Sequence, residues 1–137
     1  MEYFEWSTSL SVHDPLMDAD HQMLLNLVNE LHSAAELGTD YLTLSAILEK
    51  IEKFTHAHFQ KEEKLMLEIA YPKIESHCEQ HRKFLDRVAD LQQQLNRARD
   101  TVALETAELL RFWFTYHIML SDKQLVDTLH GGAIDSE

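Results

Sequence analysis

The sequence predicts an all-α protein, an up-down-up-down antiparallel four-helix bundle that follows an irregular N-terminal loop. Two observations lead to this prediction. The 137 residues include three Gly and two Pro, so few positions favour turns, and such a composition favours helices. Apolar residues also recur every three or four positions in four long segments, which is typical of helices that bury one face. Four long helices with short connections pack as a bundle.

The chain is expected to form a single domain over residues 1–137, because this length is ordinary for one domain with its own core. Residues 1–17, in which the letters HDP are expected to interrupt any helix, form the N-terminal loop. Residues 18–129 form the bundle, and residues 130–137 form a tail that is expected to fray. The sequence shows no internal repeat that would indicate a second domain.

The first predicted helix begins at Asp18 or Asp20, since either side chain can cap the free N–H groups of a helix start. Gly38 is expected to end this helix, because glycine tolerates the left-handed backbone found just past many helices. Asp40 is the predicted cap of the second helix, which ends before the letters YP. The buried face of the first helix comprises His21, Leu24, Leu25, Val28, Leu31 and Ala35.

The second helix carries polar residues where its buried face should continue. The three- to four-residue spacing of its apolar side chains leads on to His58 and Glu62. A buried carboxylate without a partner costs free energy. Either the helix ends before these residues, or a group in the core binds the imidazole nitrogen and the carboxylate oxygen. The apolar part of the face comprises Leu44, Ile47, Leu48, Ile51 and Phe54.

The third and fourth helices continue this pattern. Pro72 suits the first turn of the third helix, and Asp100 or Thr101 can cap the fourth. The buried face of the third helix comprises Ile74, His77, His81, Phe84, Val88, Leu91 and Leu95. The face of the fourth comprises Ala103, Ala107, Leu110, Trp113, Phe114, His117, Leu120 and Ser121.

Polar residues of the four faces are expected to meet at one height in the bundle. In an antiparallel hairpin, residues equally far from the turn lie side by side. By this count His21 matches His58 across the first turn. Glu62 matches His81 across the second turn, and His81 matches His117 across the third. The seven residues of this predicted layer are His21, His58, Glu62, His77, His81, His117 and Asp122.

Spacing along the helices supports the layer in part. His58 and Glu62 are four residues apart, and so are two histidines of the third helix, so each pair shares one helix face. His117 and Asp122 are five residues apart, which separates them by roughly 140° on an ideal helix. Asp122 must therefore reach back, or the helix must be irregular at this point, as in a π-bulge.

A metal centre explains the buried layer, because metal ions replace the lost hydration of their ligands. Seven ligands are too many for one transition metal. Five imidazoles, two bridging carboxylates and one bridging solvent oxygen fill all but one position of two six-coordinate ions. Mixed imidazole and carboxylate ligands at this coordination number suit iron or manganese, whereas structural zinc prefers four ligands. A single open position suits reversible binding of a diatomic ligand.

Four stretches carry a family resemblance: "DADHQMLLNLVNEL", "HFQKEEKLM", "YPKIESHCEQHRKF" and "WFTYHIMLSD". With their ordered His, His-x-x-x-Glu, His-x-x-x-His and His-x-x-x-x-Asp pattern, they resemble the bacterial haemerythrins (hemerythrins), the non-haem di-iron proteins that bind oxygen. The N-terminal "FEWSTSLSV" resembles the loop that closes the bundle in that family. The resemblance covers about residues 4–128.

The resemblance implies two iron ions per chain with a bridging oxo or hydroxo group. It assigns His77, His81 and His117 to one iron and His21 and His58 to the other, with Glu62 and Asp122 as bridging carboxylates. Dioxygen would then bind end-on at the two-histidine iron and be held at the peroxide level. Residues that could line an apolar oxygen pocket, or serve only as core, are Leu24, Phe59, Trp113, Phe114, Thr115 and Ile118.

Two residues depart from the family pattern. His13 stands where relatives commonly have Gly, and Thr115 replaces a commonly apolar residue two positions before a ligand. We hypothesise that Thr115 adds polarity near bound oxygen and speeds autoxidation, which the autoxidation half-life of Thr115→Val would test.

The predicted function is reversible dioxygen binding for oxygen storage, delivery or buffering. The alternatives are an oxygen or redox sensor, which the expected lack of a fused output domain disfavours, a di-iron enzyme of the peroxidase or nitric oxide reductase type, and a zinc or iron store. The net charge of −12 disfavours nucleic acid and anionic membranes as partners. A single cysteine and the lack of a signal-peptide pattern lead us to expect a cytoplasmic protein.

Overall fold

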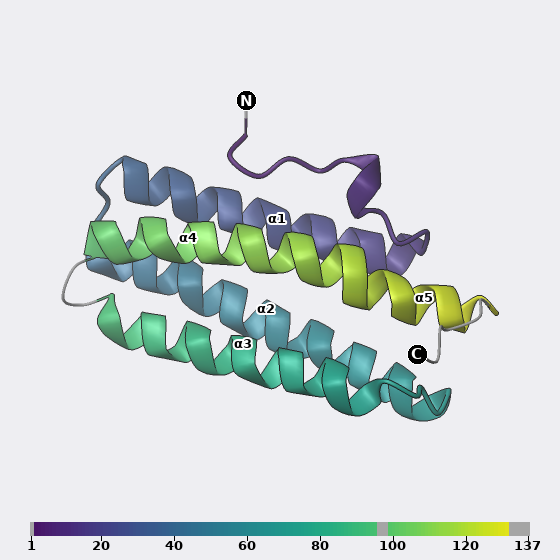
Figure 1. Ribbon diagram of the computed structural model, residues 1–137. Coiled ribbons are helices and arrows are strands. Elements are labelled where there is room, and N and C mark those ends of the chain that lie inside the picture. The colour runs from purple at the N-terminus through teal and green to yellow at the C-terminus, as the bar shows by residue number, and fades with distance from the viewer. Residues whose placement is uncertain (1, 96–98, 132–137) are drawn as a thin grey trace.

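The computed structural model describes residues 2–95 and 99–131, which form an antiparallel four-helix bundle (Figure 1). Helix α1 packs against α2 and α4, and α3 packs against α2 and α4. This arrangement confirms the predicted fold class. The elements in chain order are η1 Thr8–Leu10, α1 Pro15–Glu36, α2 Tyr41–Glu68, α3 Ile74–Gln94, α4 Arg99–Tyr116, the π-helical η2 His117–Asp122, and α5 Lys123–Leu129.

Helix α1 begins earlier than the sequence predicted. Its cap is Asp14, whose side chain accepts hydrogen bonds from the N–H groups two and three residues later. The prediction of Asp18 or Asp20 as the cap is therefore wrong. Pro15 explains the difference, because proline suits the first position of a helix, where its missing N–H is not needed. The letters HDP thus start a helix instead of interrupting one.

The hairpin between α1 and α2 follows the prediction. Gly38 lies two residues past the end of α1 with a φ of 68°, in the left-handed region that glycine tolerates. Asp40 caps α2, because its side chain accepts a hydrogen bond of 2.8 Å from the N–H of Thr43.

The starts of α3 and α4 differ from the predictions. Pro72 lies two residues before α3, in the turn that leads to it, so it is not part of the first helical turn. Helix α4 begins at Arg99, so neither Asp100 nor Thr101 precedes it. The side chain of Asp100 lies outside the described part of the chain.

The N-terminal segment lies along α1 and α4 (Figure 1). Asn29 of α1 accepts a hydrogen bond of 2.7 Å from the N–H of Phe4 and donates one of 2.8 Å to its carbonyl. Asp18 accepts hydrogen bonds from the hydroxyl of Ser11 and the N–H of Val12. Phe4 and Val12 are buried. These contacts fasten the irregular segment to the bundle.

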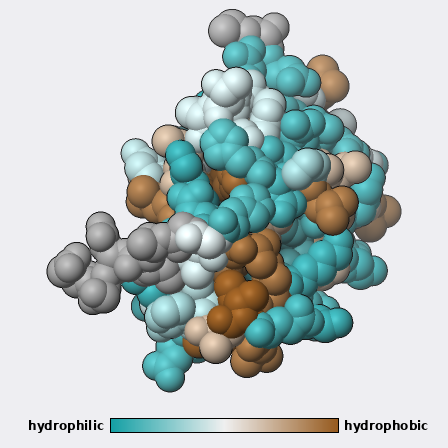
Figure 2. All heavy atoms as spheres, turned by 90° about the vertical axis from the view of Figure 1, so that its right-hand side faces the viewer, coloured by the Kyte–Doolittle hydropathy of each residue, from teal (hydrophilic) through white to brown (hydrophobic). Residues whose placement is uncertain are grey.

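The core consists of a large apolar cluster and a small one. The small cluster contains Met66, Tyr71 and Leu125, at the end of the bundle where α2 meets α3. A surface of mixed polar and apolar side chains covers this end (Figure 2). Within the described residues, no helix combines the length and apolar character that crossing a membrane requires.

Candidate metal centre

The seven residues of the predicted polar layer come together inside the bundle. They form two groups in which one ligand atom of each residue lies within 4.8 Å of the others. All seven side chains are buried, and the most exposed of them, His117, is 5% exposed. The first group contains Glu62, His77, His81, His117 and Asp122, and the second contains His21, His58, Glu62 and Asp122.

A π-helical turn brings the last two of these residues together. Asp122 follows His117 by five residues, a spacing that an α-helix would place on different faces. In η2 the hydrogen bonds span one residue more than in an α-helix, which is typical of π-helical insertions at functional sites. His117 Nε2 consequently lies 3.0 Å from Asp122 Oδ1. Of the two alternatives that the sequence left open at Asp122, the structure shows the irregular helix.

The two oxygens of Glu62 face different histidine groups. Its Oε2 atom lies 2.7 Å from His58 Nε2. Its Oε1 atom lies 3.1 Å from His77 Nε2 and 3.0 Å from His81 Nε2. The carboxylate of Glu62 therefore spans the space between the two groups.

Asp122 divides its oxygens in the same way. Its Oδ2 atom lies 3.1 Å from His21 Nε2. Its Oδ1 atom lies 3.1 Å from His77 Nε2 and 3.0 Å from His117 Nε2. Each of the two carboxylates thus presents one oxygen to each histidine group.

Opposite charges at close range shift the pKa values of these residues. Burial lowers the pKa of His21 and His77, but hydrogen bonds to Asp122 and Glu62 outweigh burial and raise each pKa to about 9. Burial raises the pKa of Glu62, but hydrogen bonds from the surrounding imidazoles outweigh it and hold this pKa well below its usual range. Burial and the charge of Glu62 raise the pKa of Asp122, but the neighbouring imidazoles of His117 and His21 outweigh them and lower it.

The donors of the cluster fit a pair of metal ions. Several of their buried nitrogen and oxygen atoms lie close together without forming well-directed hydrogen bonds, a costly state for buried polar atoms. A metal ion would give each of these atoms a partner. Imidazole nitrogens together with carboxylate oxygens, and no thiolate, suit iron or manganese better than structural zinc. The atoms concerned are Nε2 of His21, Nε2 of His58, Glu62 Oε2 and Asp122 Oδ1.

Two further carboxylates orient histidines of the cluster from outside it. Asp20 Oδ2 lies 2.8 Å from His58 Nδ1, and Glu63 Oε2 lies 2.9 Å from His81 Nδ1. Such contacts fix which ring nitrogen carries the proton and leave the other free for a metal. Sequence reasoning missed both residues, reading Asp20 as a helix cap and Glu63 as solvated. Their only signal was adjacency to a ligand in the sequence.

The side-chain amide of Gln80 orients His117 of η2 in the same way. The Oε1 atom of Gln80 lies 2.9 Å from His117 Nδ1 and accepts a hydrogen bond of 2.7 Å from the hydroxyl of Ser121. Gln80 therefore ties α3 to the π-helical turn at two points. Nothing in the sequence singled this residue out.

Aromatic rings pack directly on the histidines. Phe59 stacks on His81 with ring centroids 3.7 Å apart, and Trp113 stacks on His117 at 4.3 Å. Three more of the residues proposed for an oxygen pocket are buried. These three are Leu24, Phe114 and Ile118.

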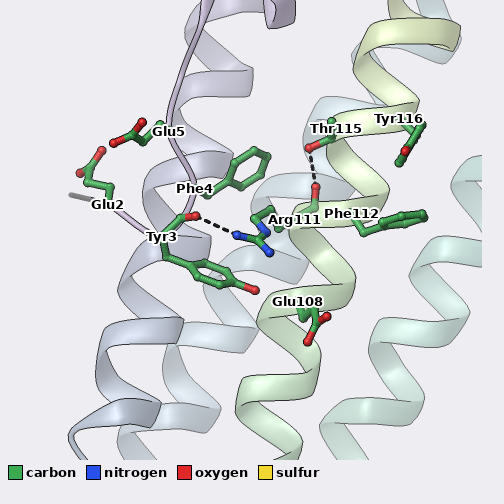
Figure 3. Close-up of a pocket in the computed structure, with 9 residues that line it drawn as sticks. All are labelled: Glu2, Tyr3, Phe4, Glu5, Glu108, Arg111, Phe112, Thr115 and Tyr116. Atoms are coloured by element: carbon green, nitrogen blue, oxygen red, sulfur yellow. Dashed lines mark hydrogen bonds between the residues drawn. The ribbon is translucent and has the colours of Figure 1, made fainter.

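Thr115 occupies a different environment from the other residues of that set. Its hydroxyl donates a hydrogen bond of 2.7 Å to the carbonyl of Arg111 in its own helix. Thr115 lines a cavity of about 470 Å³ between α4 and the N-terminal segment. In this cavity Arg111 donates a hydrogen bond to the carbonyl of Tyr3 (Figure 3). Because its hydroxyl is engaged within the helix, the structure does not support a free polar group at the histidine cluster.

The fold and the cluster together define a class, the helical-bundle proteins that bind metal through buried histidines and carboxylates. The sequence model of the "Hemerythrin HHE cation binding domain" matches residues 13–129, and the chain belongs to the haemerythrin family, whose members bind iron and oxygen. The family resemblance of the sequence is thereby confirmed.

Curated relatives and a solved structure agree with this assignment. A bacteriohemerythrin of Pseudomonas aeruginosa is 27% identical over 129 residues, which cover 94% of this chain and 83% of the relative. A bacteriohemerythrin of Methylococcus capsulatus is 28% identical over 106 residues, covering 77% and 80%. A crystal structure of a hemerythrin variant matches with a TM-score of 0.82 and 26% identity, covering 90% of this chain and 94% of the other.

Proposed function

We propose that this chain holds two iron ions and binds dioxygen reversibly, for oxygen storage, delivery or buffering. One observation carries the proposal. Glu62 and Asp122 each present one oxygen to the group that contains His21 and to the group that contains His77. Carboxylates placed in this way suit two neighbouring metal ions with a bridging oxo or hydroxo group between them.

The proposed ligand assignment follows the two groups. His77, His81 and His117 hold one iron, while His21 and His58 hold the other. Because the second iron has one imidazole fewer, it is the one proposed to have an open position. When bound, this iron pair supplies the electrons that dioxygen binding requires.

The protein contributes an apolar environment around the cluster. Stacked rings such as Phe59 on His81 fix the orientation of ligand imidazoles and limit the access of water. Water can supply the protons with which bound oxygen leaves in a reduced form, and this loss leaves the irons oxidised. Exclusion of water disfavours this side reaction and so favours reversible binding. We propose that the pocket for oxygen is formed by Leu24, Phe59, Trp113, Phe114 and Ile118, without Thr115, which lines a different cavity.

The test is an anaerobic titration of the iron-loaded chain. Iron analysis should give two ions per chain. Oxygen added to the reduced protein should produce a visible absorption band that disappears under vacuum and returns with oxygen. Irreversible bleaching, or fewer than two irons per chain, would reject the proposal.

A sensor is the second candidate, and one contact favours it. Segment η1 of the N-terminal loop packs against η2, which carries two of the proposed ligands. A change at the metal centre that moved η2 would therefore reach the loop. A pull-down whose partners differ between reduced and oxidised protein would support this function. Turnover of peroxide or nitric oxide with a defined electron donor would instead identify an enzyme.

A further inference from the structure

An ion pair at the bundle surface is linked to the proposed two-histidine iron. Asp20 Oδ2 lies 2.8 Å from His58 Nδ1, and Lys61 Nζ lies 3.3 Å from the same oxygen. The three side chains form a continuous line from the cluster to solvent, because His58 is 3% exposed, Asp20 22% and Lys61 70%. The carboxylate therefore interacts with an imidazole on its buried side and an ammonium group on its exposed side.

We propose that Asp20 is a positioning residue for His58 and that Lys61, by pairing with Asp20, sets how strongly His58 donates electron density to its iron. This inference rests on the proposed function. Asp20 keeps the proton on Nδ1, so that the lone pair of Nε2 points toward Glu62 and the metal position. A carboxylate that accepts this proton's hydrogen bond makes the imidazole a stronger donor.

Lys61 weakens this effect because it competes for the negative charge of Asp20. A stronger imidazole donor stabilises ferric over ferrous iron. Since oxygen capture withdraws electrons from iron, stronger donation should tighten oxygen binding. Loss of Lys61 should therefore tighten oxygen binding, and loss of the charge of Asp20 should weaken it.

The surroundings of the pair favour a measurable effect. Asp20, Lys61 and His58 line a cavity of about 430 Å³ whose other walls include Leu16, Met17 and Leu65. Hydrogen bonds are stronger electrostatically beside apolar groups than in open water. Lys61 itself is exposed, and exposed ion pairs contribute little to folding. Substitution of Lys61 should therefore remove the positive charge that pairs with Asp20 without unfolding the chain.

The test compares three substitutions in the iron-loaded protein. Lys61→Met should lower the oxygen dissociation constant and Asp20→Asn should raise it, each by about two- to fivefold, the range that an exposed ion pair supports. Lys64→Met is the matched control, because Lys64 lies on the same exposed helix surface but does not line this cavity. The control should leave the dissociation constant unchanged.

Two further readouts do not depend on oxygen. The hyperfine-shifted Nδ1–H proton signal of His58 should persist in Asp20→Asn, whose amide oxygen still accepts, and exchange rapidly with water in Asp20→Ala. The apparent iron affinity of Asp20→Ala should fall by about 10- to 100-fold. Added salt should shift wild-type oxygen affinity toward that of Lys61→Met, because salt screens the exposed ammonium group.

The two proposals fail in different ways. If Lys61→Met and Asp20→Asn hold two irons and bind oxygen reversibly, but their affinities are unchanged or move in the same direction, the role of this ion pair is overturned and the proposed function stands. If Asp20→Asn does not fold, the oxygen dissociation constant of Lys61→Met and the salt dependence of the wild-type affinity test the role of the ion pair without it. A wild-type chain without two irons or without reversible oxygen binding overturns both.

Discussion

At the scale of single residues, His13 has a backbone conformation that is unusual for a residue other than glycine. Its φ is 62°, in the left-handed region that glycine occupies without strain. The glycine that the family resemblance leads us to expect here would adopt this backbone conformation without strain, whereas histidine adopts it at a cost.

The first prediction concerns this strained position. His13→Gly should stabilise the chain by up to about 1 kcal/mol, because relief of left-handed strain exceeds the extra entropy of glycine in the unfolded chain. His13→Val should destabilise it, since a β-branched side chain suits this region worst. Urea unfolding of both variants measures the effect. Equal stability of the glycine and valine variants would contradict the explanation.

The second prediction concerns the bridging role proposed for Glu62. Glu62→Gln keeps the size of the side chain but leaves one oxygen instead of two, so it cannot serve both histidine groups. Iron bound per chain should fall from two to one or fewer, as measured by elemental analysis. Glu68→Gln, an exposed change at the end of the same helix, is the control and should retain two. Full iron loading of Glu62→Gln would exclude a bridging role.

At the scale of elements, the π-helical turn η2 decides whether the fourth helix can contribute two ligands. The sequence identified the difficulty, because the five-residue spacing of His117 and Asp122 does not suit an α-helix. Only the structure shows that the helix changes its winding at this point, and that Gln80 holds the turn through His117 and Ser121.

The third prediction changes the spacing of the two ligands in this turn. Insertion of one alanine after Met119, which is 39% exposed, should place Asp122 one residue further along the helix and rotate it away from the histidines by roughly 100°. Circular dichroism should stay helical while iron binding falls below two ions per chain. Met119→Ala keeps the spacing and should retain both ions. Normal iron content in the insertion variant would show that the five-residue spacing of His117 and Asp122 is dispensable.

Helix boundaries also show where sequence reasoning is strong and where it is weak. Asp40 is the cap that the sequence predicts, and its side chain accepts a hydrogen bond from the N–H of Thr43. The letters HDP predict an interruption of the helix where the structure has the cap Asp14, because proline breaks helices in their interior but is well suited to a first helical position. The same residue type carries opposite meanings inside a helix and at its start.

At the scale of the whole molecule, four helices concentrate opposite charges in one buried layer, and this couples stability to pH. In the metal-free chain the pKa values of His21 and His77 are about 9, above the ordinary value of 6.5. Their stabilising contribution is present below pH 6.5 and lost as the pH rises through 9. The pKa values of Glu62 and Asp122 are lowered from the ordinary 4.5 and 3.8. Their stabilising contribution is therefore present above these values and is lost as the pH falls below them.

The fourth prediction follows from these signs. The melting temperature of the metal-free chain should fall between pH 6.5 and 9, since these histidines then lose the protons that pair with Glu62 and Asp122. Apparent iron affinity should rise over the same range, because metal binding displaces the same protons. Thermal melts and iron titrations at several pH values measure both trends. If the melting temperature and the iron affinity both rose, or both fell, between pH 6.5 and 9, the explanation would be contradicted.

The sequence by itself determined the helical class, because hydrophobic spacing is a local property that survives without tertiary information. It also indicated which seven polar residues share one height, since counting from a turn needs only the length of each helix. Tertiary structure alone decided which oxygen of Glu62 faces which histidine, and which outer groups hold the second ring nitrogens. Those features depend on side-chain direction and on contacts such as that of Asp20 with His58, between residues 38 positions apart, and linear spacing does not encode them.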